Sequence, residues 1–136
     1  MIEPEMAFTD LKAMLELTEK FLKYVIGVCV ERYGEELDFL QKMYEPDLLE
    51  TLKHIHQTQF ETLTYTEAVD ILLKSGESFE FPVKWGVDLQ SEHERYLTEK
   101  HLKKPLNLIN YPAEIKAFYM KRDPGNDKVV LGMDIL

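Results

Sequence analysis

The sequence predicts an α+β fold in which helices come first and an antiparallel sheet comes last. Apolar residues recur at a helical period through the N-terminal half of the chain. Three short apolar segments separated by turn residues close it. Helices followed by a run of strands are typical of α+β domains, and 136 residues are enough for one domain with a buried core.

The first predicted elements are a short edge strand and a long helix. Residues 1–8 alternate in polarity and contain Pro4, and proline has no N–H group to donate within a central strand. Thr9-Asp10 then supplies an N-cap for a helix whose apolar face runs through residues 11–30. Gly34 is predicted to end this helix, with a further helical turn after it.

Five elements are predicted in the middle of the chain from capping, period and breaker residues. They are a helix that opens at Pro46 and runs to Ile55, a strand at 60–65, a helix at 67–73 entered through Thr66 and ended by Ser75-Gly76, an extended segment at 79–86, and a helix capped by Asp88 or Ser91 that runs to Lys103.

Three strands are predicted to complete the fold, at residues 106–110, 116–121 and 129–136. The sequence RDPGND at 122–127 is rich in turn-forming residues and predicts a hairpin between the last two. We therefore expect a C-terminal antiparallel meander.

Composition and charge disfavour several classes of protein, namely nucleic-acid-binding, membrane-spanning and secreted ones. The net charge is −9, with 25 acidic and 16 basic residues, which disfavours nucleic-acid binding because its affinity comes largely from Lys and Arg. No apolar run approaches the ~20 residues of a membrane span, and the N-terminus is acidic where a signal peptide is basic. The single cysteine, Cys29, is expected to be a buried structural thiol in a reducing cytosol.

Four places could carry chemistry. Glu3 and Glu5 would share one face of a strand, although their position alone favours a solvated strand edge over a site. Lys116 is a cation in an apolar strand and could simply extend to solvent. Asp134 is an isolated carboxylate in an apolar strand, where a cation or metal is the usual partner. The charged segment 85–97 is explained as a capped, solvated helix face. The four histidines, His54, His56, His93 and His101, lack metal-ligand spacing, so no zinc is predicted.

The amino-acid sequences of several segments, and their order along the chain, resemble those of a known family. MIEPEMAF at 1–8, WGVDLQSEHERYLTE at 85–99, NYPAEIKAFYM at 110–120 and GMDIL at 132–136 are closely similar to bacterial-type asparaginyl-tRNA synthetases. The resemblance spans the whole chain. It implies part of a class II aminoacyl-tRNA synthetase catalytic domain over residues 1–136, an antiparallel sheet flanked by helices, without an anticodon-binding domain.

The resemblance also implies an activity and site residues. Members of this family use ATP and Mg²⁺ to activate asparagine and then transfer it to tRNA, as cytoplasmic homodimers. Glu3 matches the position that recognises the amino acid, and Glu5 is expected to orient that pocket. Lys116 aligns near the amino-acid side-chain pocket, and Asp134 matches the first of two carboxylates for the ATP-bound Mg²⁺. No catalytic residue is carried over.

The family's phosphate-binding arginines and second Mg²⁺ carboxylate have no match in this sequence. We therefore expect the chain alone to form almost no adenylate and to bind tRNA weakly. Two alternatives stay open: an asparagine synthetase-like paralogue that amidates free aspartate, and a non-catalytic fragment that associates with a full-length subunit.

Overall fold

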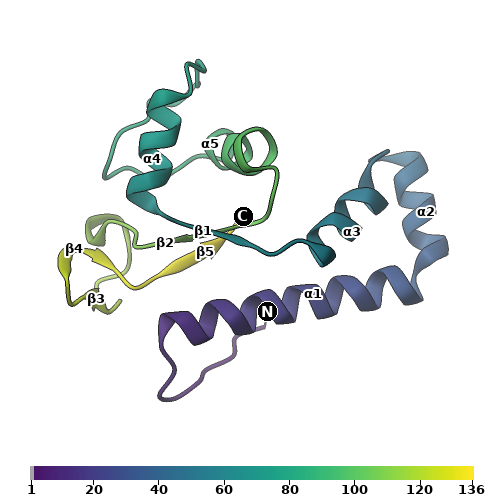
Figure 1. The fold of residues 1–136 in the computed structure, drawn as a ribbon, viewed down its shortest axis with the longest axis horizontal. Helices are drawn as coiled ribbons and strands as arrows, with labels where there is room; N and C mark the ends of the chain where they lie inside the picture. The colour runs from purple at the N-terminus through teal and green to yellow at the C-terminus, as the bar shows by residue number, and fades with distance from the viewer. Residues whose placement is uncertain (1) are drawn as a thin grey trace. The chain divides into compact units, whose positions relative to one another are not determined.

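The computed structural model describes residues 2–136, so Met1 lies outside the described residues. The chain forms two compact units, 1–57 and 58–136, and helices and short strands together confirm the α+β class (Figure 1). Within residues 2–136, no helix combines the length and the apolar character that a membrane crossing needs.

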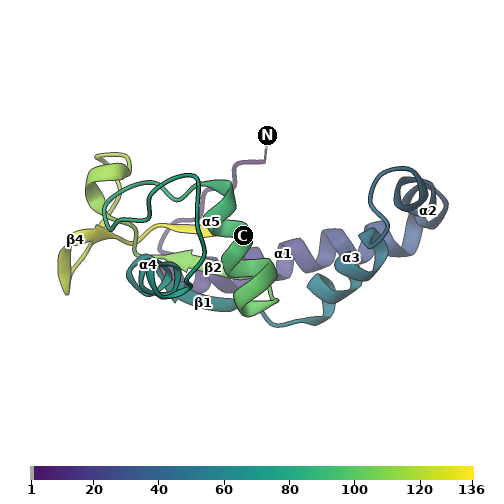
Figure 2. The ribbon, with the colours of Figure 1, turned by 90° about the horizontal axis from the view of Figure 1, so that it is seen from above.

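The N-terminal unit contains three helices, α1 (Leu11–Arg32), α2 (Gly34–Met43) and α3 (Leu48–Gln57). α3 runs alongside α1 (Figures 1 and 2). The predicted N-cap is confirmed, because Asp10 Oδ1 accepts the Ala13 N–H at 2.8 Å. The two helices come close at Gly27, where an added Cβ would lie 2.8 Å from Cε1 of His56.

Four N-terminal predictions need correction. Residues 2–8 form no strand, because none of the described residues pairs with them and a strand exists only with a hydrogen-bonded neighbour. Gly34 does not end a helix; Tyr33 is the C-cap of α1, and Gly34 is the first residue of α2. Pro46 precedes α3, which begins at Leu48. Cys29 is only partly buried.

The second unit is built around a three-stranded sheet in the order β1-β2-β5. β1 (Glu61–Thr64) pairs with β2 (Leu106–Ile109) in parallel, and β2 pairs with β5 (Met133–Ile135) antiparallel. β3 (Arg122–Asp123) and β4 (Asn126–Val130) form the hairpin predicted at the RDPGND turn. The sheet is therefore mixed, because the chain crosses over between β1 and β2 instead of turning back.

The helices of this unit cover one face of the sheet (Figure 1). They are α4 (Tyr65–Lys74), α5 (Ser91–Arg95) and the π-helical turn η1 (Tyr96–Leu102). Leu106 and Leu108 of β2 are fully buried on this face, among Tyr65, Leu72 and Leu97. Each such side chain contributes about 1.5–3 kcal/mol by its burial.

Four further predictions in this unit need correction. α4 is capped by Thr64 and not Thr66, since Thr64 Oγ1 accepts the Glu67 N–H and the Glu67 carboxylate bonds back to Thr64. The helix predicted from Asp88 or Ser91 has Gln90 as its N-cap. Residues 116–121 form no strand; the short 3₁₀ turn η2 (Ala113–Ile115) and a loop replace it, and β4 and β5 divide the predicted 129–136 strand.

Candidate functional site

The candidate site centres on Asp134, which β5 places opposite Leu108 of β2. Lys116 follows η2 and donates from Nζ to Asp134 Oδ2 at 2.9 Å. The Lys116 side chain is 21% exposed and that of Asp134 is 47% exposed. The sequence analysis expected a cation or metal beside this carboxylate, and the loop that replaces the predicted 116–121 strand brings Lys116 to it.

Tyr111 lies beneath this ion pair. Its side chain is buried, and the Lys116 ammonium lies 3.9 Å from its ring centroid, well within cation–π range. The Asp134 carboxylate lies within electrostatic reach of the Tyr111 hydroxyl. Burial raises the pKa of the Tyr111 hydroxyl far above its ordinary value, and Asp134 raises it further, so the hydroxyl remains a donor.

Glu94 of α5 is the fourth residue of this group. We call the group the Asp134 cluster; its residues are Glu94, Tyr111, Lys116 and Asp134. Partial burial raises the pKa of Glu94, and the Asp134 carboxylate raises it further, whereas His93 and Lys116 lower it. A partly buried carboxylate whose pKa is raised by burial and by a second carboxylate within electrostatic reach is typical of functional sites. The sequence analysis treated Glu94 and Tyr111 only as parts of longer segments.

Asp134 fits a single-carboxylate contribution to a Mg²⁺ site. Its side chain is about half exposed, and only one of its oxygens is paired with Lys116. Among residues 2–136, no three His, Cys, Asp or Glu side chains are placed to hold a metal together. Mg²⁺ is commonly bound by one or two carboxylates together with substrate phosphates, so these residues suit a nucleotide-bound ion rather than a protein cage.

The other two predicted site residues belong to the N-terminal unit. Glu3 and Glu5 are both exposed and lie outside any strand. The prediction that they share a strand face is therefore wrong for this structure. Of the predicted site residues, Lys116 and Asp134 are the pair that the structure brings together.

The segment before α5 is tied to that helix by two neighbouring side chains. The Glu92 carboxylate accepts the N–H groups of Glu80 at 2.9 Å and Phe81 at 2.7 Å. The His93 ring is 1% exposed; Nδ1 accepts from the Gln90 N–H at 3.0 Å, and Nε2 lies 3.1 Å from the Phe81 carbonyl. Residues 85–97 are thus not merely a solvated face, because this histidine is part of the core.

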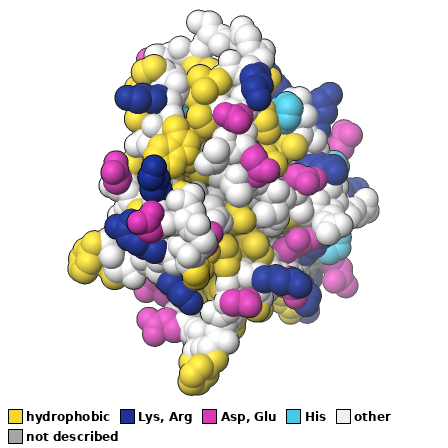
Figure 3. Space-filling model, turned by 60° about the vertical axis from the view of Figure 1, so that its left-hand side comes forward, with side chains coloured by type: hydrophobic (Ala, Val, Ile, Leu, Met, Phe, Trp, Pro, Cys, Tyr) yellow, Lys and Arg dark blue, Asp and Glu magenta, His cyan; other side chains and the backbone are white. Residues whose placement is uncertain are grey.

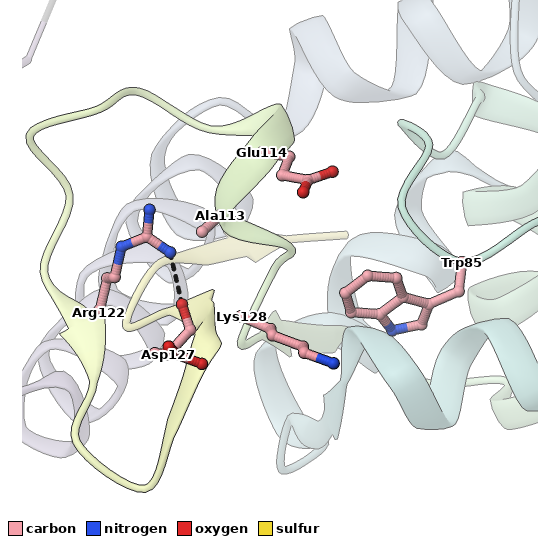
Figure 4. A pocket seen from close by; sticks show the side chains of 6 residues that line it. All are labelled: Trp85, Ala113, Glu114, Arg122, Asp127 and Lys128. Carbon is pink, nitrogen blue, oxygen red and sulfur yellow. Dashed lines mark hydrogen bonds between the residues drawn. The ribbon is translucent and has the colours of Figure 1, made fainter.

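A pocket of about 400 Å³ opens beside the hairpin (Figure 4). Trp85 forms one wall, and its Nε1–H donates to Thr66 Oγ1 at 3.0 Å. Lys128 of β4 extends its ammonium toward the indole (Figure 4). The remaining lining residues are Ala113, Glu114, Arg122 and Asp127. The pocket contains none of the predicted site residues, and its two cations and two carboxylates leave it without net charge.

Surface charge agrees with the composition. On the face shown in Figure 3, basic and acidic side chains are interspersed, and no large basic patch forms. The net charge of −9 is therefore not offset on this face by a concentrated phosphate-binding surface.

Comparison with known proteins finds a matching family and similar ligases. The family model described as tRNA synthetases class II (D, K and N) matches residues 1–136. The asparagine–tRNA ligase of Cytophaga hutchinsonii is 52% identical over 136 residues, which cover all of this chain and 29% of that protein. That of Solibacter usitatus is 54% identical over 138 residues, again 29% of its length.

Solved structures give the same picture. The crystal structure of asparaginyl-tRNA synthetase from Pyrococcus horikoshii aligns with a TM-score of 0.80 at 35% identity, covering 96% of this chain and 28% of that one. The same synthetase complexed with asparaginyl-adenylate also aligns at 0.80. The chain thus spans under a third of the length of the proteins that it matches.

Proposed function

The chain belongs to the class II tRNA synthetases (D, K and N), and on this premise we propose that it forms part of the catalytic domain of an asparagine–tRNA ligase. The observation that carries the proposal is 52% identity to such a ligase along all 136 residues. The whole protein would use ATP and Mg²⁺ to activate asparagine and transfer it to tRNA, as a cytoplasmic homodimer.

Charge complementarity supports specific roles for the predicted residues. The Glu3 carboxylate would accept hydrogen bonds from the side-chain amide of asparagine, with Glu5 orienting it. An aspartate substrate would instead bring like charges together, which costs several kcal/mol in a desolvated pocket. Lys116 would lie beside the amino-acid side chain.

Asp134 would be the first of two carboxylates that bind the nucleotide-bound Mg²⁺. When bound, this ion neutralises developing charge on the triphosphate. The half-exposed carboxylate supplies the oxygen that such a hard cation prefers. Lys116 pairs with Oδ2 of this carboxylate at 2.9 Å, which leaves Oδ1 as the oxygen available to the ion.

The test is a chimera in which these 136 residues replace the matching segment of the Cytophaga hutchinsonii ligase. We expect asparagine-dependent exchange of pyrophosphate into ATP, with no exchange when aspartate is supplied. Glu3→Ala in the chimera should weaken the use of asparagine far more than the use of ATP, because the lost carboxylate contacts only the amino acid.

Two results would contradict the proposal. One is a chimera that folds and dimerises like its parent but gives no exchange with asparagine. The other is a Glu3→Ala chimera in which the KM values for asparagine and ATP keep their ratio. Glu114→Ala provides the matched control, since this exposed glutamate lies outside the Asp134 cluster and its loss should change neither value.

A further inference from the structure

The Tyr111 ring is a fixed platform in the second unit. Its side chain is 3% exposed and packs against the Tyr65 ring at a centroid distance of 5.5 Å. The Tyr111 carbonyl accepts the Val130 N–H at 2.9 Å, and the next residue, Pro112, bridges to Val129. Contacts to a core helix and to β4 therefore hold the ring independently of Lys116.

Lys116 has no comparable support from its own backbone. It follows a single 3₁₀ turn and begins a loop in which the next aromatic residues, Phe118 and Tyr119, are 97% and 77% exposed. Its side chain is nevertheless only 21% exposed. Ordering a lysine side chain costs up to about 2 kcal/mol of conformational entropy, so its placement depends on the partners that its ammonium meets.

Among residues 2–136, the structure gives the ammonium two direct contacts, which differ in kind. Asp134 Oδ2 lies 2.9 Å from Nζ, and the Tyr111 ring centroid lies 3.9 Å from it. The carboxylate is half exposed and can be taken by another cation, whereas the ring is buried and neutral. A cation–π contact contributes about 0.5–2 kcal/mol, comparable to an exposed ion pair at about 0–1 kcal/mol.

We propose that Tyr111 is a positioning residue that keeps the Lys116 ammonium at the site when Asp134 is engaged by another partner. The face of the ring holds the lysine ammonium beside the Asp134 carboxylate. Lys116 and Asp134 can then act on separate groups of a substrate without the lysine being released to solvent. This inference rests on the proposed function for the roles of Lys116 and Asp134, but not for the contact itself.

The test follows the Lys116 side chain by NMR in the full 136-residue chain with labelled lysine. Protons above an aromatic ring are shifted upfield, so the Lys116 methylene signals nearest the ammonium should lie upfield of those of the other lysines. Asp134→Asn removes the ion pair at an exposed position and should leave most of that shift in place. Tyr111→Phe should also keep it, and Tyr111→Leu should abolish it.

The outcomes separate the proposal from its rivals. Lys116 signals that move to solvent-exposed values in Asp134→Asn would show that the ion pair alone holds the lysine, and would overturn the proposal. An unchanged upfield shift in Tyr111→Leu would do the same. Should Tyr111→Leu unfold, the Asp134→Asn result still decides. Because no arm measures asparagine activation, failure here is distinct from failure of the proposed ligase activity.

Discussion

At the scale of single residues, the contact between Gly27 and His56 should offset the stability that a helix usually gains when glycine is replaced by alanine. Gly→Ala inside a helix usually stabilises by about 0.5–1 kcal/mol. A Cβ at Gly27 would meet Cε1 of His56 at 2.8 Å, and moving the ring would break the bond from His56 Nδ1 to the Lys23 carbonyl at 2.9 Å. That bond contributes about 0.5–1.5 kcal/mol, so we expect Gly27→Ala to change helix stability by almost nothing.

When His56 is replaced by alanine, the clash is removed, and the stabilising effect of Gly27→Ala should become measurable. In that variant Gly27→Ala should stabilise α1 by the full ~0.5–1 kcal/mol, measured as the opening free energy of α1 amides by hydrogen exchange. Gly34→Ala is the matched control, because no atom lies within 4 Å of its added Cβ. An equal effect of Gly27→Ala in both backgrounds would rule out the coupling.

At the scale of elements, Glu92 fastens the segment before α5 to that helix. Hydrogen bonds from two backbone N–H groups lower the pKa of Glu92 below its ordinary 4.5; the bond from Phe81 has the larger effect and the bond from Glu80 the smaller. A lowered folded-state pKa means that this stabilisation is present above the unfolded value and is lost as pH falls through the folded value. We therefore expect the Glu80 and Phe81 amide signals to move together below about pH 4.5, as the contact breaks.

Substitution should reproduce the acid effect. Glu92→Gln keeps one acceptor oxygen and has no charge, so the two amide signals should be displaced at neutral pH and insensitive to acid. Glu99→Gln serves as control, since that glutamate pairs with exposed Arg95 at 3.0 Å and, among residues 2–136, does not bond the Glu80 or Phe81 N–H groups. Amide signals of Glu80 and Phe81 that ignore pH in the unmodified chain would refute the contact.

At the scale of the whole molecule, burial is unequal between the two units. Within the described residues, no side chain of 2–57 is buried, and the core lies entirely in the second unit. Hydrogen exchange should therefore give β2 and α4 amides much higher opening free energies than those of α1–α3. Leu108→Ala should cost about 2–5 kcal/mol and lower protection across the second unit.

A surface-facing leucine of α1 gives the comparison. Leu17 is 38% exposed, so Leu17→Ala leaves little cavity and should cost well under the Leu108→Ala value. Equal protection of the two units in the unmodified chain, or equal costs for the two substitutions, would show that burial within these units does not set their stability.

Local signals explain which predictions succeeded. Asp10 caps α1, residues 61–64 form a strand, and RDPGND turns a hairpin, because capping, alternation and turn chemistry act over a few neighbouring residues. Residues 116–121 contain a run of four apolar residues between two lysines, which favoured a strand, yet they form a loop. In that loop the Lys116 ammonium meets the Asp134 carboxylate and the Tyr111 ring, contacts that the local pattern does not encode.

By itself, the sequence determined the fold class, the first helix and the kinds of chemical group available, and its segments carried the resemblance that the family comparison confirmed. Only the tertiary structure decided that Glu94, Tyr111, Lys116 and Asp134 form one cluster and that β1 lies parallel to β2. Contacts between residues about forty positions apart in the sequence depend on how the helices pack over the sheet. Local periodicity does not predict that packing.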